Sequence, residues 1–179
     1  MAIVHVRIDY RLIHGQVATF WTNHLKTTRI MVVDDAAAKD DIKKAALKIA
    51  TPGGVALSVL SVEKAAENID SGRYDGQRVM MILGSVATLQ ALLSRGVRLT
   101  ACNVGNLAKG PGKIAVSPTV ALTAEEADAL QAIGTQGIEL TLQLIPSSPV
   151  SQLIPALKKH SIHNCRKITG ISSRCASVQ

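Results

Sequence analysis

The sequence predicts an α/β fold with an open, mainly parallel central sheet of about six or seven strands and helices on both faces. Short apolar runs rich in β-branched residues recur along the chain, and stretches of helical character separate most of them. This alternation is typical of parallel strands connected by helices that cover the sheet. A length of 179 residues suits one domain with a single buried core.

The strands are expected where the apolar runs lie. In chain order these runs are Ile3 to Ile8, Ile30 to Val33, Val55 to Leu60, Val79 to Leu83, Leu99 to Val104 and Leu140 to Ile145. Between Lys113 and Leu122 the pattern is less regular, because Pro118 divides two short apolar pieces. We predict one short strand on either side of this proline.

The helices are expected between these runs, where apolar residues recur with a helical period. Thr123 and Glu126 fit a capping box, and Ser61 is placed to cap the stretch that follows it. Glycines just beyond several stretches provide stop signals. The expected helices are Gln16 to His24, Asp40 to Ala50, Val62 to Asp70, Val86 to Ser94, Ala124 to Ile133 and Ser151 to Lys159.

Charge is unevenly distributed along the chain. The formal net charge is +7, but residues 1–149 carry 15 basic against 13 acidic residues, while residues 150–179 carry five basic residues and no acidic one. We therefore predict a domain over residues 1–157 and a basic tail of unknown role over 158–179. The tail either favours an acidic partner or the anionic inner leaflet of a membrane, or is an idle solvated end.

Composition excludes several classes of function. Only four aromatic residues occur, so the chain lacks the stacking platforms typical of single-strand nucleic-acid binding, and no nucleic-acid partner is expected. No run of 18 apolar residues could span a bilayer, and no cleavable leader opens the chain, so a cytoplasmic protein is expected. Cys102, Cys165 and Cys175 have neither metal spacing nor an even count, and reduced thiols are expected.

The segment from Arg7 to Val17 carries the chemistry. His14 falls where the first strand has ended and a helical period begins, with Arg11 three residues before it and Gly15 directly after it. A neutral imidazole can carry a phosphoryl group covalently, and a guanidinium offers paired donors that match phosphate oxygens. A glycine lets the backbone approach those oxygens, and the helix that follows directs free N–H groups toward them.

A second interpretation of the same residues assigns them no chemistry. A single histidine near a strand end is often a surface or partly buried residue without a chemical role. On that interpretation Arg7 and Arg11 are solvated charges, and Asp9 is a turn or capping residue. Physical chemistry alone does not choose between these two interpretations of His14.

The run Arg7-Ile-Asp-Tyr-Arg-Leu-Ile-His-Gly-Gln-Val17 resembles the signature of the IIB components of the mannose/fructose/sorbose family of the bacterial sugar phosphotransferase system (PTS). Further pieces follow in the family's order: Val32-Val33-Asp34-Asp35 with Ala38 and Asp40, Ala50-Thr51-Pro52-Gly53, Asn103-Val104-Gly105-Asn106 and Gly112-Lys113. The resemblance runs from about residue 2 to about residue 155. One departure is Tyr10, where many members carry a second aspartate, and no role is transferred to it.

The resemblance implies a phosphocarrier that works as a protein-N-phosphohistidine:sugar phosphotransferase. His14 would accept the group from a phosphohistidine on a IIA partner and pass it to a sugar taken up with the permease subunits IIC and IID. Arg11 would bind the phosphoryl group, assisted by the loop residues Leu12, Ile13, Gly15 and Gln16. The protein itself would be cytoplasmic and held at the inner face of the plasma membrane through the permease.

Several other side chains are expected at the same edge of the sheet, since ligands of open α/β sheets bind at the carboxyl ends of strands. Asp9 follows the first strand, and the remaining candidates for an orienting or rim role are Asp34, Asp35, Asn103 and Asn106. Carboxylates beside a phosphoryl group also repel it, and helix capping explains the aspartates equally well.

No cofactor or metal is expected. Gly105 to Gly110 has the glycine spacing of a nucleotide-binding P-loop, but Pro111 stands where the lysine belongs. His160, His163 and Cys165 are close in sequence, but three such residues in a tail are weak evidence for a metal site.

Two rival functions remain. The first is a regulatory protein that depends on a phosphohistidine but takes no part in transport. The second is a receiver-like signalling domain that forms an aspartyl phosphate on Asp34 or Asp35. A receiver, however, places its acceptor after the third strand and an acidic pair after the first, and this chain does neither.

Overall fold

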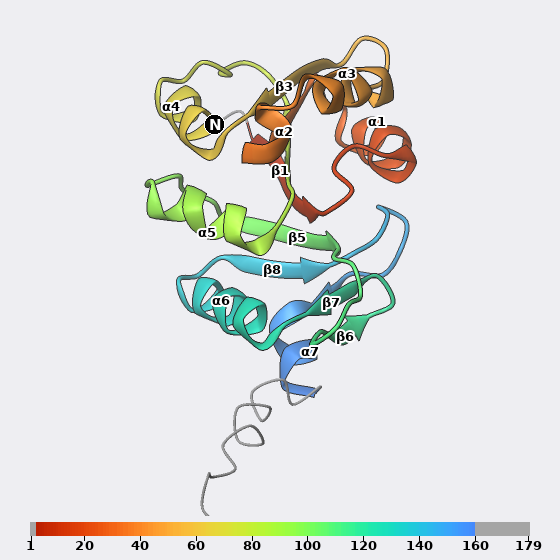
Figure 1. The fold of residues 1–179 in the computed structure, drawn as a ribbon, viewed down its shortest axis with the longest axis vertical. Helices are drawn as coiled ribbons and strands as arrows, with labels where there is room; N and C mark the ends of the chain where they lie inside the picture. The colour runs from red at the N-terminus through yellow and green to blue at the C-terminus, as the bar shows by residue number, and fades with distance from the viewer. Residues whose placement is uncertain (1–2, 160–179) are drawn as a thin grey trace, which may run out of the picture.

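The computed structural model describes residues 3–159, and it contains a seven-stranded, mainly parallel sheet with the strand order β3-β2-β4-β1-β5-β8-β9. All neighbouring strands pair in parallel except β8 and β9, which are antiparallel. The predicted fold class is confirmed (Figure 1). The strands are β1 (Ile3–Asp9), β2 (Arg29–Val33), β3 (Ala56–Leu60), β4 (Val79–Leu83), β5 (Ala101–Asn106), β8 (Glu139–Leu142) and β9 (Ser151–Gln152).

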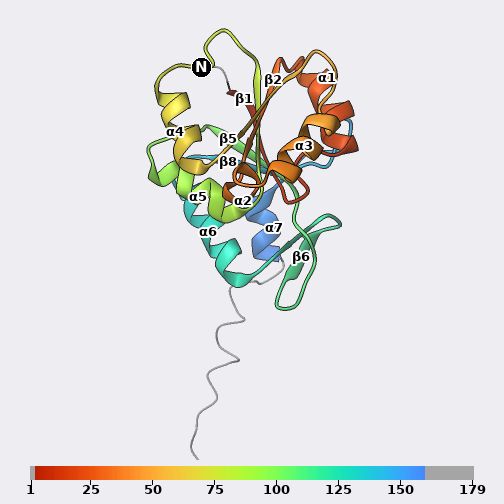
Figure 2. The same cartoon turned by 45° about the horizontal axis from the view of Figure 1, so that its top comes forward.

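Helices cover both faces of this sheet. Figure 2 shows α4 and α5 on one side of the strands and α1 and α3 on the other. The helical elements are η1 (Gln16–Trp21), α1 (Thr22–Leu25), α2 (Asp35–Ala38), α3 (Asp41–Ala50), α4 (Val62–Asp70), α5 (Val86–Ser94), α6 (Ala124–Thr135) and α7 (Leu153–Lys159). Among the residues that the structure describes, no helix is long and apolar enough to cross a membrane.

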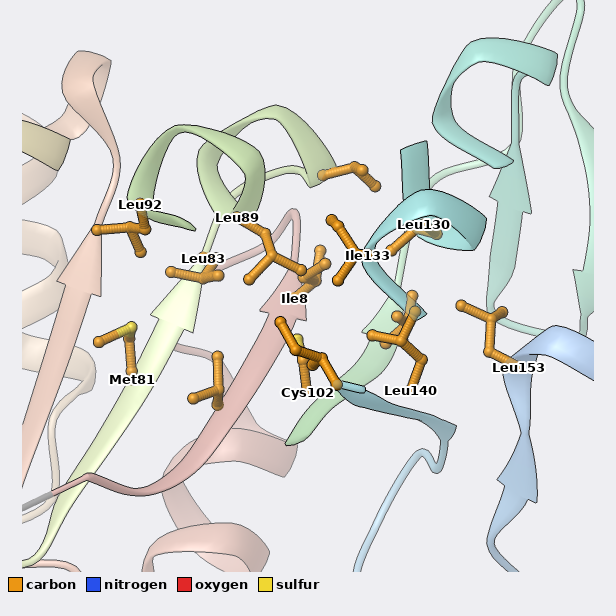
Figure 3. Close-up of a cluster of buried hydrophobic side chains, with 14 of the residues drawn as sticks. Ile8, Met81, Leu83, Leu89, Leu92, Cys102, Leu130, Ile133, Leu140 and Leu153 are labelled. Atoms are coloured by element: carbon orange, nitrogen blue, oxygen red, sulfur yellow. The ribbon is translucent and has the colours of Figure 1, made fainter. Parts of the chain in front are cut away.

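The larger hydrophobic core lies between the sheet and helices α4 to α7. Ile8, Met81 and Leu83 point from the strands toward Leu89 and Leu92 of α5 (Figure 3). Cys102 and Leu140 extend the same layer toward α6 and α7, as Figure 3 also shows. Because side chains alternate along a strand, the residues between these belong to the opposite face.

The smaller core lies between that opposite face and the segment η1, α1, α2 and α3. Met80 and Ile82 of β4 pack there with Val17 and Trp21 of η1 and Leu47 of α3. Both layers are apolar, which explains why the central strands read as continuous apolar runs in the sequence. Ile82 and Met81, adjacent in sequence, thus serve different cores.

Most predicted helices and strands are confirmed, with shifts of at most three residues at their ends. The capping box at Thr123 is formed, since its side chain accepts from Glu126 N–H and the Glu126 carboxylate accepts from Thr123 N–H. Ser61 caps α4 as expected. The pieces on either side of Pro118 form an antiparallel pair, β6 (Ile114–Ser117) and β7 (Val120–Leu122).

Three details differ from the expectation. The first six residues of the helix predicted over Gln16 to His24 form a π-helix. The four-residue helix α2 was not predicted, because Ala36 to Ala38 is too short to show a period. Ser151 and Gln152 do not begin the last helix but pair with β8, and the Gln152 side chain donates to Glu139.

The predicted tail is outside the described residues from position 160 onward, and so are His160, His163, Cys165 and Cys175. Lys158 and Lys159 form the last turn of α7. The sheet places β1 in its interior, between β4 and β5. The carboxyl end of β1, where Asp9 leads into the loop toward His14, is therefore flanked by the ends of two other strands.

Candidate phosphoryl-transfer site

The central strand β1 carries polar side chains on one face and apolar ones on the other. Val6 and Ile8 are buried in the larger core, while His5, Arg7 and Asp9 alternate with them. Arg7 and Asp9 are 0% exposed. A buried cation and a buried anion at neighbouring positions on one face are costly to desolvate unless each is paired and hydrogen-bonded.

Arg7 and Asp9 meet this requirement through each other. Both Nε and Nη2 of Arg7 donate to Asp9 Oδ2, at 3.1 and 2.9 Å. The remaining nitrogen, Nη1, donates to Asn103 Oδ1 at 2.6 Å and to the Gln143 carbonyl at 2.9 Å. Burial lowers the pKa of Arg7 from its ordinary value, and the charge and hydrogen bonds of Asp9 oppose that shift.

His14 adds its imidazole to the same carboxylate. Its Nε2 lies 3.0 Å from Asp9 Oδ2, and its side chain is 10% exposed. A carboxylate accepts the N–H of a neutral imidazole, so this contact favours the tautomer with the proton on Nε2. The other ring nitrogen, Nδ1, then keeps its lone pair, which is the electron pair that a nucleophile needs.

The backbone between Asp9 and His14 folds into a tight turn. Leu12 N–H donates to the Asp9 carbonyl at 2.9 Å, and Leu12 has a φ of 57°, in the left-handed region. Arg11 N–H donates to Asp9 Oδ1 at 3.2 Å. Asp9 thus holds the turn with one carboxylate oxygen and the imidazole with the other. Left-handed conformations of non-glycine residues are costly and gather at functional sites.

Arg11 lies in the predicted loop but not against the imidazole. Its side chain is exposed, and within residues 3–159 it forms no hydrogen bond or ion pair. It lines a hollow of about 470 Å³ with Tyr10, Asp34 and Lys43, among others. The Arg11 guanidinium is therefore free to contact an anion. The buried Arg7, by contrast, is already paired with Asp9.

The predicted loop continues from Leu12 into the helix. Leu12 and Ile13 pack with the smaller core, and the His14 carbonyl accepts from Ala18 N–H at 2.8 Å. A Cβ at Gly15 would meet no protein atom within 4 Å, and its φ of −47° is open to any residue. The turn therefore does not require glycine here, and the space in front of Gly15 is open. Gln16 begins η1.

The structure separates the predicted rim residues by what they bind. Asn103 joins the site, through Arg7. Asn106 contributes its backbone carbonyl, which accepts from Tyr10 N–H at 3.1 Å. Asp34 caps α2 through Ala37 N–H, at 2.7 Å, and Asp35 accepts from Val62 N–H at the start of α4, at 2.9 Å. Both aspartates therefore have capping partners.

Sequence reasoning gave no role to three residues that surround the ion pair. The Gln143 carbonyl binds Arg7, Trp21 lies over the Arg7 guanidinium with its ring centroid 5.5 Å from Cζ, and Gly105 provides the space that the guanidinium fills. One signal was present in the sequence. His5, Arg7 and Asp9 form a polar stripe along a strand that otherwise reads as buried, and such a stripe needs partners.

His5 lies one step further back on this face. Its ring stacks on Trp21, with 4.4 Å between the centroids. Burial, then the charges of Arg7 and His24, lower the pKa of His5 to about 4.

No group of three or more metal-binding side chains occurs within the described part of the chain. On the far side of β5, burial raises the pKa of the Cys102 thiol to about 12.

The fold and the site together describe an α/β protein with an open, mainly parallel sheet and a carboxylate-bound histidine just beyond the carboxyl end of its central strand. The family model for the PTS system sorbose subfamily IIB component matches residues 3–167. The chain belongs to this family of sugar-specific IIB components of the phosphotransferase system.

Individual relatives agree with this assignment. The chain is 35% identical over 159 residues to the PTS system mannose-specific EIIAB component of Escherichia coli K12, covering 89% of this chain and 49% of the relative. It thus spans about half the length of that relative. It is 31% identical over 154 residues to the sorbose-specific EIIB component of Lacticaseibacillus casei, covering 86% of this chain and 94% of the relative.

Solved structures show the same fold. The IIBSor domain of the sorbose permease from Klebsiella pneumoniae superposes with a TM-score of 0.85 at 28% identity, covering 90% of this chain and 99% of that domain. The manxB structure from Thermoanaerobacter tengcongensis gives a TM-score of 0.84 at 31% identity, covering 89% and 96%. The predicted family and fold are therefore confirmed.

Proposed function

We propose that this protein accepts a phosphoryl group on Nδ1 of His14 from the phosphohistidine of a IIA protein or domain, and transfers it to a sugar during uptake. The observation that carries this proposal is the contact between His14 Nε2 and Asp9. This contact favours the tautomer with the proton on Nε2, in which the Nδ1 lone pair is available to attack phosphorus.

Each transfer exchanges one bond to phosphorus for another. In the first, the Nδ1 lone pair attacks phosphorus, and the P–N bond to the donor imidazole breaks with its electron pair returning to that ring. In the second, a sugar hydroxyl oxygen attacks phosphorus, the P–Nδ1 bond breaks with its electron pair returning to Nδ1, and the hydroxyl proton passes to solvent. Asp9 stabilises the positive charge that forms on the His14 ring in the phosphorylated state.

Arg11 and the backbone at the start of η1 are the proposed binding groups for the phosphoryl oxygens. Arg11 is exposed and unpaired within the described residues, so it can form a bidentate contact with an arriving anion. The first N–H groups of a helix lack partners within the helix and attract anions. Leu12, Ile13, Gly15 and Gln16 set the course of this backbone.

The proposed partners are a IIA protein or domain and the membrane subunits IIC and IID. The name of the EIIAB relative supports a IIA donor, since in that protein both components share one chain. The relatives are named for mannose, sorbose and fructose, so the proposed substrate is a sugar of this kind. We propose that the protein works at the inner face of the plasma membrane, held there by the permease.

The proposal is tested by phosphorylating the full-length protein through the general upstream carriers and the cognate IIA. We expect one labelled residue, His14, and no label in His14→Ala. The label should survive alkali and be lost in acid, because the P–N bond of a phosphoramidate is stable in base and hydrolyses in acid. A His14→Ala variant that accepts a full equivalent of phosphate, or a label that is lost in base, would refute it.

The two rivals are separated by different measurements. The receiver-like function needs Asp34 or Asp35 as a free acceptor, whereas both accept backbone N–H groups at helix starts. A purely regulatory protein would be labelled on His14 but would form no sugar phosphate with membranes that contain the cognate permease. Screening sugars against such membranes identifies the substrate as well.

A further inference from the structure

We propose that Arg7 is a positioning residue, which clamps the Asp9 carboxylate so that Asp9 holds the His14 ring with Nε2–H inward and Nδ1 outward. This inference rests on the proposed function, since it concerns how the same histidine is prepared for transfer. Arg7 does not touch the transferred group in this arrangement. It acts through Asp9.

The first support is that Arg7 and His14 share one carboxylate oxygen. Arg7 Nε, Arg7 Nη2 and His14 Nε2 all lie 2.9 to 3.1 Å from Asp9 Oδ2. Three donors around one oxygen leave the carboxylate little freedom to rotate. Two of the three come from a rigid planar group, so the guanidinium plane defines where the imidazole must lie.

The second support is that Arg7 is itself fixed at its other end. Nη1 binds both Asn103 Oδ1 and the Gln143 carbonyl. Trp21, whose ring covers the guanidinium, is held in turn by the bond from its Nε1 to the Leu144 carbonyl at 3.1 Å. The clamp is therefore anchored to β5, to the segment after β8 and to η1, and not to the loop that carries His14.

The third support is a space shaped for this one side chain. Strand β5 has a register shift opposite Ile8 and Asp9, where Asn106 pairs with Asp9 and Gly105 is the extra residue. A Cβ built at Gly105 would overlap the Cζ, Nη1 and Nη2 atoms of Arg7. The bulge and the missing side chain at Gly105 thus leave room in β5 for the guanidinium. An arginine that supplied charge from the surface would need no such space.

A lysine could not take the same part. Its single ammonium group would supply one charge, but it cannot reach Asp9, Asn103 and the Gln143 carbonyl in a fixed plane at once. Without the clamp, the Asp9 carboxylate would keep just two partners within residues 3–159, His14 Nε2 and Arg11 N–H. The Asp9 carboxylate could then rotate, and the His14 imidazole could adopt the tautomer with its proton on Nδ1.

Gly105→Ala offers the sharpest test, because it displaces the guanidinium without altering any group that forms a hydrogen bond through its side chain. Gly110→Ala is the matched control, since a Cβ at Gly110 meets no protein atom within 4 Å. Two readouts are needed for each variant: the tautomer of His14 from nitrogen-15 NMR of the unphosphorylated protein at pH 8, and the rate of phosphoryl acceptance from IIA.

We expect wild type and Gly110→Ala to show the single Nε2–H tautomer and equal rates. In Gly105→Ala we expect mixed tautomers and a rate at least about tenfold lower, since the residues that orient metal-binding histidines by hydrogen bonds contribute about 10- to 100-fold. Arg7→Lys should behave in the same way, and Asn103→Ala should show a smaller change in the same direction. These two variants decide the matter if Gly105→Ala does not fold.

A folded Gly105→Ala or Arg7→Lys protein that keeps the wild-type tautomer would overturn the inference, whatever its rate. Mixed tautomers at an unchanged rate would overturn it as well. The NMR readout needs no phosphoryl donor, so it separates this inference from the proposed function. If wild-type His14 shows the expected tautomer but never accepts a phosphoryl group, the proposed function fails and the clamp on the ring stands.

Discussion

The Nε2 atom of His14 lies 3.0 Å from Oδ2 of Asp9, the same oxygen that receives two hydrogen bonds from Arg7. The histidine is thus bonded to a buried ion pair, while its side chain remains 10% exposed. A nucleophile requires both conditions, because one nitrogen must be held and the other must be reached.

Arg11→Ala should slow phosphoryl acceptance by at least about tenfold, a conservative value beside the ~10³ to 10⁵ that supplied arginines contribute in other phosphoryl transfers. The fold should be unaffected, because the Arg11 side chain is exposed and forms no hydrogen bond within residues 3–159. Rapid-quench labelling with phosphorylated IIA measures the rate, and circular dichroism checks the fold. Equal rates in the variant and wild type would remove Arg11 from the site.

Asp34→Ala should lower the free energy of unfolding by about 1 kcal/mol, because it removes the side-chain cap of α2. Labelling of His14 should persist in this variant and in Asp35→Ala. Urea unfolding measures the first effect, and phosphorylation by IIA the second. Loss of the label in either variant, with the fold preserved, would instead assign that aspartate to phosphoryl chemistry.

Lys26→Gly should stabilise the protein by about 0.5 to 1 kcal/mol, since Lys26 ends α1 with a φ of 49° and pays the cost of a left-handed residue with a side chain. Lys39→Gly is the matched control. Lys39 ends α2 with a φ of −104°, where glycine brings no relief, and this variant should be neutral or destabilised. Urea unfolding of both proteins gives the comparison.

Acid should destabilise the folded protein partly through His5. Its ordinary pKa of 6.5 falls to about 4 in the fold, so between these pH values the unfolded chain binds a proton that the folded chain does not. Stability contributed by the neutral ring is therefore present above pH 6.5 and is lost as the pH falls toward 4. The full loss amounts to about 3 kcal/mol.

His5→Phe isolates this contribution, because phenylalanine can still stack on Trp21 but does not titrate. Between pH 7 and 4 the variant should lose less unfolding free energy than wild type does. Urea unfolding at several pH values provides both curves. Parallel curves would show that His5 is protonated equally in both states.

The sequence predicted the sheet well, because its signals are local. Apolar runs such as Val79 to Leu83 are buried on both faces, so composition alone marks them as strands. Caps are equally local: Thr123 and Glu126 are three residues apart, and each accepts the backbone N–H of the other. The short strand β9 depends on its pairing with β8, which no local period reveals, and the helical period after Gly15 does not distinguish a π-helix from an α-helix.

The candidate site was predictable in its centre and not in its surroundings. The segment from Arg7 to Val17 indicated His14, Arg11 and Asp9 together, because they are close in sequence. Asn103 and Gln143 reach Arg7 from 96 and 136 residues away, and only the strand order brings them together. The arginine judged to be a possible surface charge, Arg7, proved to be 0% exposed.

The bulge in β5 has a consequence for anyone who redesigns this protein. The Arg7 guanidinium fills the space beside Gly105, so the two positions are coupled: a methyl group at 105 displaces the guanidinium, and a shorter side chain at 7 leaves that space unfilled. Mutant libraries that randomise the histidine loop while leaving β5 unchanged would miss the variants in which positions 7 and 105 change together. Paired changes at 7 and 105 are the ones that can provide a new set of side chains to hold the His14 imidazole in place.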